Sequence, residues 1–285
     1  MLSSSESEFV DAHVHLSDPE YSKITDNLIE DAEKSNVIAL VANSMNLGTS
    51  LQSLQLAQRY KGRVYAALGI HPWNVKDLTQ NELEDVVQLI LDHSKDPMTV
   101  AIGETGLDPQ YIEKAKNKTE LQELQHKVFH EMLKIAEKTS LPMIIHSRGT
   151  SPQIIDMLPS YRVKKVLLHW FSRPLELLPE IASRGYYVSE GPPTVYSKGT
   201  QEVIRQVPLE NLLTETDGPV RYFGRPFKGE TTRPSYIPMI VEAIAEIRNA
   251  KREEIARQIL LNFRNLFNIR PKATTSNKRQ RKDAT

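Results

Sequence analysis

Short apolar runs rich in valine, isoleucine and leucine recur along the chain and alternate with longer segments of helical period. Alternation of this kind predicts β-α units whose strands form a parallel sheet buried on both faces. The apolar runs lie at residues 9–16, 37–44, 64–72, 99–108, 142–147, 164–171, 186–191 and 212–219. Because eight parallel strands close a TIM-type barrel, the pattern predicts an α/β fold of the (β/α)8 barrel class.

The segments between and after these runs carry apolar side chains at helical spacing. The predicted helices occupy residues 21–35, 49–60, 80–93, 119–138, 151–158, 174–183, 200–206, 236–248 and 252–267. In the segment 119–138, Thr119 and Gln122 have the spacing of a capping box, so we expect Thr119 to cap that helix. A loop at residues 221–232 separates the last predicted strand from the last two helices.

The length of 285 residues suits one barrel, which typically needs about 250 residues. No linker rich in proline, glycine or serine interrupts the pattern, so we expect a single domain over residues 9–269. The flanking segments 1–8 and 270–285 are polar and lack periodicity, which predicts disordered tails. The C-terminal tail is basic and could contact phosphates or serve as a targeting patch, although solvated disorder is the commoner explanation.

The composition excludes several functional classes. Cysteine is absent, which rules out disulfides, thiolate metal sites and a cysteine nucleophile. No run approaches the roughly 18 apolar residues that span a bilayer, and the N-terminus does not look like a secretory signal, so we expect a cytoplasmic protein with no membrane attachment. Lysine plus arginine balances aspartate plus glutamate at 36 each, so a polyanionic substrate would need local basic patches.

The first apolar run carries a His-x-His pair. Asp11, His13 and His15 occupy alternate positions of this predicted strand and therefore point to one of its faces. Imidazole nitrogens are good ligands for divalent metals, and two of them on one rigid strand need little ordering when an ion binds. Alone, however, such a pair is more often incidental than a metal site.

Polar side chains end most of the other runs as well. They are His71, Glu104, His146, His169 and Asp217. Each has an ordinary structural explanation by itself, as a loop charge, a buried imidazole bound to a carbonyl group or a turn residue. In a (β/α)8 barrel, however, the carboxyl ends of the strands meet at the active face. Together with the His-x-His pair, Glu104, His146, His169 and Asp217 predict a site for two divalent ions with nitrogen and oxygen ligands.

Two hydrolytic metal ions lie about 3.5–4 Å apart and need a shared ligand. A carboxylate can bridge them and an imidazole cannot, so Glu104, which lies between the two histidine groups in barrel order, is the predicted bridge. The remaining ligands divide by their place in the barrel into His13, His15 and Asp217 for one ion and His146 and His169 for the other. Metal-bound water is the expected nucleophile, and Asp217 orients it or takes its proton, which makes Glu104 and Asp217 the expected catalytic residues.

Several residues near these ligands are candidates for contacts with a substrate. His71, Arg148 and Arg221 flank the predicted ligands and could bind a phosphate group, with rim packing or simple solvation as the alternative. Trp73 and Trp170 could stack on a base, although packing is at least as common for such residues.

Two further carboxylates lie one step deeper on the strands that carry the ligands. Asp11 shares the strand phase of His13, and Glu215 shares that of Asp217, which fits partners that orient the ligands. The remaining histidines lie on predicted helices and receive no role; they are His93, His126 and His130.

The motifs DAHVHL, GIHPW, GETGLD, LPMIIHSR, HWFS and TETDGP occur in this order along the chain. Together they resemble the TatD-type metal-dependent DNase family within the amidohydrolase-like barrels, and the similarity covers residues 9–269. The resemblance implies a TIM-type barrel with one or two divalent ions, the same six ligands, and action on phosphodiesters, often as a DNA exonuclease or repair nuclease. Pro109 stands where family members usually have a tyrosine, and Gly149 where an acidic residue is common, so we expect the substrate pocket to differ.

With this resemblance, the sequence predicts a hydrolase of phosphodiester bonds in DNA, a 3′-end exonuclease or repair-type DNase acting on single strands or 3′ ends, and a monomer. Histidine and carboxylate ligands are compatible with Zn, Mg, Mn or Ni. Two alternatives remain open. One keeps the ions but cleaves a small ester, lactone or amide. The other is a barrel that binds without catalysis, although loss of function should leave gaps among six costly polar residues.

Overall fold

Eight parallel strands form the centre of the molecule in the computed structural model, which describes residues 7–271. The strands are β1 (Phe9–Val14), β2 (Val37–Asn43), β3 (Val64–Leu68), β4 (Thr99–Gly106), β5 (Met143–His146), β6 (Val166–Leu168), β7 (Tyr187–Glu190) and β8 (Leu212–Thr214). Each strand pairs with the next one in sequence, from β1 to β8. All eight apolar runs are strands of one sheet, and the predicted barrel class is confirmed.

The segment after β8 brings the last strand back to the first, which makes the barrel nearly closed. The amide of Asp217 donates to the carbonyl of His13 at 2.9 Å, and the amide of His15 donates to the carbonyl of Gly218 at 2.8 Å. Asp217 has a left-handed backbone with φ of 50°, a conformation that ends the extended chain at this point. The main chain therefore joins β1 to β8 at the end of the barrel where polar side chains gather.

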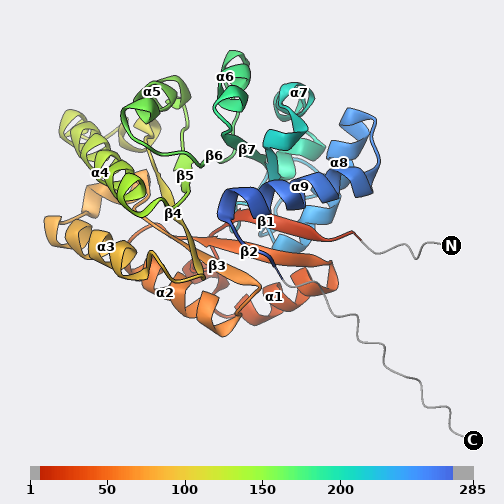
Figure 1. Ribbon diagram of the computed structural model, residues 1–285, viewed down its shortest axis with the longest axis horizontal. Helices are drawn as coiled ribbons and strands as arrows, with labels where there is room; N and C mark the ends of the chain where they lie inside the picture. Colours follow the sequence, from red (N-terminus) through yellow and green to blue (C-terminus); the bar gives the residue numbers. More distant parts are fainter. Residues whose placement is uncertain (1–6, 272–285) are drawn as a thin grey trace, which may run out of the picture.

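Helices cover the outside of the sheet (Figure 1). In residues 7–271 they are α1 (Thr25–Lys34), α2 (Leu47–Arg59), α3 (Gln80–His93), α4 (Lys118–Thr139), α5 (Ser151–Met157), α6 (Leu178–Ser183), α7 (Lys198–Gln206), α8 (Ile237–Arg248) and α9 (Arg252–Phe267). Each predicted helix is present, and the bounds of α3 and α9 agree with the prediction. Short 3-10 helices supplement them, including η2 (Pro72–Asp77) after β3 and η3 (Pro109–Ile112) after β4.

The predicted capping box at Thr119 is wrong. α4 begins one residue earlier, and no side chain caps its first turn. A capping box forms instead at α2, where Asn46 Oδ1 accepts from the Thr49 amide and Thr49 Oγ1 accepts from the Asn46 amide, both at 2.9 Å. The apolar period places the start of this helix at residue 49, inside the true first turn, and so hides the cap.

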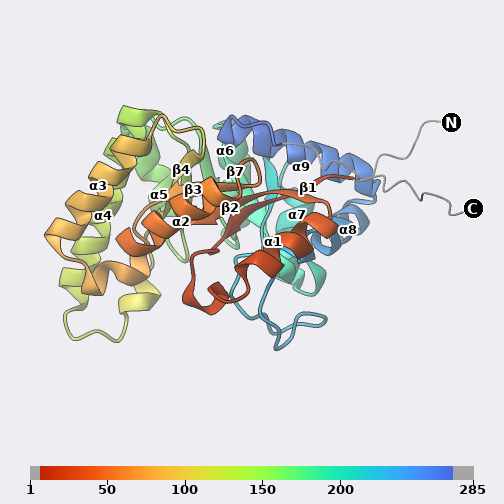
Figure 2. The same ribbon diagram turned by 90° about the horizontal axis from the view of Figure 1, so that it is seen from below.

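The two ends of the barrel differ. α9 lies at the end where strands begin, with the Arg252 guanidinium 4.9 Å from the Phe9 ring centroid. Asn262 Nδ2 donates at 2.8 Å to the carbonyls of Leu209 and Leu212, just before and at the start of β8. The loops after β1, β4 and β8 project from the opposite end (Figure 2). The polar side chains at the strand ends therefore face the loops and not α9.

The predicted tails lie almost entirely outside the described residues, which leave out 1–6 and 272–285. Among the helices in residues 7–271, none is long and apolar enough to cross a membrane.

Candidate metal centre

The six predicted metal ligands come together at the loop end of the barrel. They are His13 and His15 from β1 and the residues after it, Glu104 from β4, His146 from β5, and His169 and Asp217 from the segments after β6 and β8. Each of these residues is at most 9% exposed. Because parallel strands in a barrel bring their carboxyl ends together, side chains far apart in sequence meet here around one carboxylate.

That carboxylate is Glu104, whose two oxygens face different histidines. Oε2 lies 3.1 Å from Nε2 of His13 and 3.1 Å from Nε2 of His15. Oε1 lies 2.8 Å from Nδ1 of His146 and 2.8 Å from Nε2 of His169. One carboxylate thus joins two histidine groups that come from opposite parts of the barrel.

Asp217 completes the group on the Oε2 side. Its Oδ1 lies 3.2 Å from His13 Nε2 and 3.5 Å from His15 Nε2, and the two histidine nitrogens are 3.2 Å apart. The three residues offer ligand atoms that all lie within 4.8 Å of one another. This spacing suits a single ion between one carboxylate and two imidazoles.

For His15 and His146, the ring nitrogen that points away from Glu104 lies beside a hydrogen-bond acceptor. His15 Nδ1 is 3.1 Å from the carbonyl oxygen of Asn43, and His146 Nε2 is 2.7 Å from Asp108 Oδ2. An acceptor at the far nitrogen keeps the proton of a neutral imidazole there. The lone pair of the near nitrogen then faces Glu104, as metal ligation requires.

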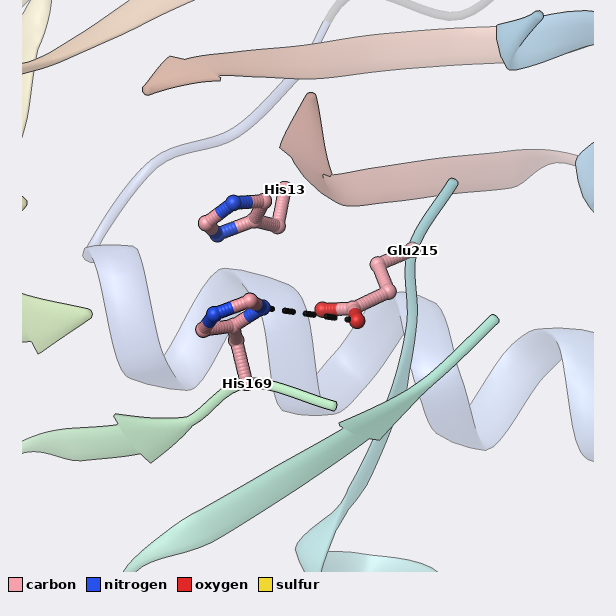
Figure 3. A group of neighbouring side chains, drawn as sticks. All are labelled: His13, His169 and Glu215. Atoms are coloured by element: carbon pink, nitrogen blue, oxygen red, sulfur yellow. Dashed lines mark ion pairs between the residues drawn. The ribbon is translucent and has the colours of Figure 1, made fainter. Parts of the chain in front are cut away.

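The far nitrogen of His169 makes an ion-pair contact with Glu215 but no hydrogen bond with a described residue (Figure 3). Its Nδ1 lies 3.5 Å from Glu215 Oε1, and Ser189 Oγ donates to the other oxygen of Glu215 at 2.5 Å. The rings of His13 and His169 are stacked, with centroids 4.0 Å apart and planes 6° from parallel. The stack holds the two rings face to face beside Glu104, so that Nε2 of each faces this carboxylate.

His71 has the opposite arrangement. Its Nδ1 accepts a hydrogen bond from the Trp73 amide at 3.1 Å, and its Nε2 lies 3.1 Å from Glu104 Oε1. A neutral ring that accepts at Nδ1 carries its proton on Nε2. Burial outweighs the Glu104 charge and lowers the pKa of His71 to about 4, so the ring is neutral. Although its Nε2 lies close enough to be a ligand atom, it faces the centre as a hydrogen-bond donor.

The charges at the centre suit a cation. Burial alone would raise the pKa of Glu104, yet the surrounding imidazoles hold it well below its usual range. Burial opposes a charge on His15, but hydrogen bonds with Asp217 and Glu104, and their charges, raise its pKa to about 10. Glu104 Oε2 is buried and accepts no hydrogen bond from any described residue. A divalent ion can take the place of the proton that the two carboxylates otherwise draw onto His15, so the donor set fits such an ion.

Of the two carboxylates predicted to orient ligands, only Glu215 contacts a ligand ring. Asp11 accepts from the amide of His13 at 3.2 Å and from the amide and hydroxyl of Thr216 at 3.1 and 2.5 Å. It therefore fixes the main chain where β1 meets the segment after β8. The ring of His13 has no bond to Asp11 among the described contacts, since its Nδ1 has no hydrogen-bond partner there.

The predicted substrate contacts divide into two groups. Arg148 lies beside the centre, where its Nε donates to Asp108 Oδ2 at 2.7 Å. Arg221 lies on the loop after β8, and its guanidinium is engaged by Glu20 and by Thr231 Oγ1, the latter at 2.9 Å. The structure thus brings His71 and Arg148 to the ligands but holds Arg221 against another loop.

The two tryptophans differ as well. Trp73 is 47% exposed on η2. Trp170 packs against Tyr222, with ring centroids 5.4 Å apart.

Sequence reasoning missed three side chains near the centre. Asp108 caps η3, where its Oδ1 accepts from the Gln110 amide at 2.8 Å, and its Oδ2 lies 2.7 Å from His146 Nε2. Tyr111 lies two residues beyond Pro109, with its ring 5.7 Å from the His146 ring. Glu190 on β7 is fully buried, both its oxygens lack hydrogen-bond partners among the described residues, and burial raises its pKa well above the usual range. Glu190 ends β7 and Asp108 follows β4 by two residues. A polar residue at the carboxyl end of a barrel strand is a candidate for the active face, so this position could have identified both.

Comparisons with known proteins agree over nearly the whole chain. The sequence matches the family described as TatD related DNase over residues 10–268. Deoxyribonuclease TATDN3 of Homo sapiens is 33% identical over 266 residues, which cover 90% of this chain and 94% of that protein. The uncharacterized metal-dependent hydrolase YabD of Bacillus subtilis is 31% identical over 263 residues, covering 91% of this chain and 98% of that one. The crystal structure of YjjV, a TatD homolog from Escherichia coli, superposes with a TM-score of 0.83 at 29% identity and covers 92% of this chain and 98% of that one.

Proposed function

The chain belongs to the TatD related DNase family and is a metal-dependent hydrolase, and we propose that it cleaves phosphodiester bonds of DNA, at single strands or 3′ ends. The deoxyribonuclease name of the human relative supports the substrate class. We further propose that residues 9–269 act as one hydrolase domain and that the protein works as a monomer.

The two-sided surroundings of Glu104 carry this proposal. Glu104 would hold two divalent ions, together with His13, His15 and Asp217 on its Oε2 side and His146 and His169 on its Oε1 side. Such ions polarise a phosphoryl oxygen and lower the pKa of a water molecule towards neutrality. Zn, Mg, Mn and Ni all accept ligands of these types.

The side chains of the protein supply orientation and proton transfer. The Asp217 carboxylate orients the attacking water and takes its proton. The Nε2–H of His71, which faces the centre, donates to a non-bridging phosphoryl oxygen, and Arg148 supplies a positive charge beside it. Water oxygen bonds to phosphorus, the bond from phosphorus to the 3′ oxygen of the preceding nucleotide breaks, and that oxygen takes up the proton that Asp217 removed from the water. A 3′-terminal nucleotide leaves with its 5′-phosphate.

The test is a substrate panel on protein stripped with a chelator and supplied with each metal in turn. We expect 5′-labelled single-stranded DNA to shorten stepwise only when a divalent metal is present. A 3′-blocked strand of the same sequence should resist, which tests the preference for 3′ ends. Turnover of chromogenic esters or lactones without DNA cleavage would overturn the nuclease proposal, and absence of any turnover with every metal would favour a binding protein.

A further inference from the structure

A row of aromatic and cationic side chains leads from the Oε1 side of Glu104 to the surface. Lys76 Nζ lies 4.7 Å from the ring centroid of Trp73, and Trp73 meets the ring of Tyr111 edge to face at 4.8 Å. The guanidinium carbon of Arg148 lies 4.5 Å from the centroid of Tyr111. We call these four residues the aromatic row. Two aromatic rings in edge-to-face contact thus lie between two cations, each of which makes a cation–π contact with the nearer ring.

The aromatic row is connected to the metal centre at its inner end. Arg148 Nε and His146 Nε2 each lie 2.7 Å from the same oxygen, Oδ2 of Asp108. The Tyr111 ring lies 5.6 Å from that of His71 and 5.7 Å from that of His146. A ligand with one group at the centre would therefore meet Tyr111 and Arg148 next.

The outer end of the aromatic row is open to solvent. Trp73 is 47% exposed, although an indole of this size is usually well buried. Lys76 is exposed, and 44% of the Arg148 side chain is accessible. In residues 7–271, Nε is the sole guanidinium nitrogen of Arg148 with a hydrogen-bond partner, so its two terminal nitrogens can donate to a ligand.

The charge of the neighbouring loop points to an anionic ligand. Three exposed lysines follow Tyr111 within a few residues, against one glutamate; they are Lys114, Lys116 and Lys118, with Glu113. The whole chain is neutral by formal charge, so this local excess is the kind of basic patch that a polyanion needs. Aromatic faces flanked by cations are typical of surfaces that bind single-stranded nucleic acid.

We propose that the aromatic row is a binding subsite for an unpaired nucleotide next to the bond that is cut. The base stacks on Trp73, while Arg148 and Lys76 contact the flanking phosphates. Within a duplex both faces of a base are covered by its stacked neighbours, so a base must leave the stack to lie on Trp73, and the subsite favours single strands over duplex DNA. This inference rests on the proposed nuclease function and assigns the substrate preference to particular residues.

The main test compares Trp73→Ala with Trp73→Phe and with Leu261→Ala. Leu261 is also 47% exposed, but it lies on α9 at the opposite end of the barrel. Binding of a fluorescein-labelled 12-mer of thymidylate is measured by anisotropy in the presence of a chelator, and KM and kcat are measured with metal. We expect Trp73→Ala to weaken binding and raise KM about 10-fold.

The controls separate stacking from a general loss of structure. Trp73→Phe should keep most of the affinity because phenylalanine also stacks, and Leu261→Ala should match the wild type. All variants should melt at the wild-type temperature. The ratio of single-strand to duplex cleavage should fall in Trp73→Ala alone.

The outcomes distinguish this inference from the proposed function. Cleavage of DNA by Trp73→Ala with wild-type KM and affinity would overturn the subsite and leave the nuclease function intact. Loss of oligonucleotide binding in Trp73→Ala, in a protein whose wild type cleaves no DNA with any metal, would overturn the nuclease function and support the subsite as a binding surface.

A second measurement tests the phosphate contact. The affinity for the 12-mer is measured over a range of salt concentrations for Lys76→Ala and for Lys34→Ala. Each phosphate contact on a single strand contributes about 0.7 to the slope of log affinity against log salt. We expect Lys76→Ala to reduce that slope by about this amount. Lys34 ends α1, next to the start of β2, and its replacement should not change the slope. Equal slopes in both variants would remove Lys76 from the subsite.

Discussion

The two sides of Glu104 resemble each other in composition and differ in how their groups are held. On the Oε2 side, His13 and His15 come from one strand, and the Asp217 amide is bonded to the His13 carbonyl at 2.9 Å. The main chain of β1 and of the segment after β8 therefore sets the positions of these ligands. Asp11 adds to this by bonding amides and a hydroxyl, not an imidazole ring.

On the Oε1 side, the ligands come from separate strands, and side chains orient them. His146 is held by Asp108 at 2.7 Å, and His169 lies 3.5 Å from Glu215. On this side Asp108 also bonds Arg148, which leads towards the surface. The carboxylate of the opposite side, Asp217, contacts His13 and His15 directly. We therefore expect that removal of the Asp108 carboxylate lowers the metal affinity of the Oε1 side, whereas removal of the Asp11 carboxylate leaves the metal affinity of the Oε2 side nearly unchanged.

Replacement of the shared carboxylate should affect both sides and have the largest effect. Glu104→Gln keeps the size of the side chain but removes its charge from a fully buried cluster. Loss of one partner from a buried charge cluster costs about 3–5 kcal/mol, which is roughly 10²- to 10⁴-fold in affinity. We expect elemental analysis to find little bound metal and nuclease activity to fall to background. Wild-type metal content and activity in this variant would contradict the bridging role.

Asp217→Asn should damage the Oε2 side alone. The amide can still occupy the space beside His13 and His15, but it is a poor proton acceptor for the attacking water. We expect kcat to fall by about 10²- to 10⁴-fold, the usual range for a lost general base. Calorimetric titration should show one weakened metal site and one site of wild-type affinity. Two equally weakened sites would mean that the two sides of Glu104 are not independent.

Asp108→Asn tests the Oε1 side from outside the ligand set. The asparagine can keep the cap on Gln110 but loses the charge that orients His146. Replacement of such a partner typically lowers metal affinity about 10- to 100-fold, and titration should place this loss in one site only.

The matched control is Asp11→Asn, the corresponding carboxylate of the other side. Asp11 bonds main-chain amides near His13 and not the His13 ring. The variant should therefore melt at a lower temperature, while the folded protein keeps the metal affinity of the wild type. A fall in metal affinity from Asp11→Asn as large as that from Asp108→Asn would erase the difference between the two sides.

The sequence alone predicts the barrel and the meeting of the six candidate ligands. The barrel is predicted from the short apolar runs that form its strands. The cluster of ligands is predicted from the polar residue at the end of most of these runs. His169 and Asp217 are examples, since each follows a short buried run, Val166–Leu168 and Leu212–Thr214. The closed order of strands then brings these ends together without further information.

The sequence points to Glu215 as a partner of a ligand but not to Asp108, because the pairing of Asp108 with His146 forms between separate segments of the barrel. Asp108 contacts His146 from the segment after β4. Its role as the cap of η3 is sufficient to account for an aspartate at this position, so the sequence gives no sign of the second contact. The role of His71 depends on one amide, that of Trp73, which fixes the proton on the opposite ring nitrogen. No periodic pattern records a contact of either kind.

The smallest expected effect concerns Arg221, which the sequence assigns to phosphate binding. Its guanidinium is engaged by Glu20 on the loop after β1, so it joins two loops at the mouth of the barrel. An exposed pair of this kind contributes little, and we expect Arg221→Ala and Glu20→Ala to change KM by the same factor, below about threefold. The measurement is KM for single-stranded DNA in both variants at equal salt. If Arg221 binds phosphate instead, Arg221→Ala should raise KM well beyond this factor, while Glu20→Ala frees the guanidinium and should lower KM.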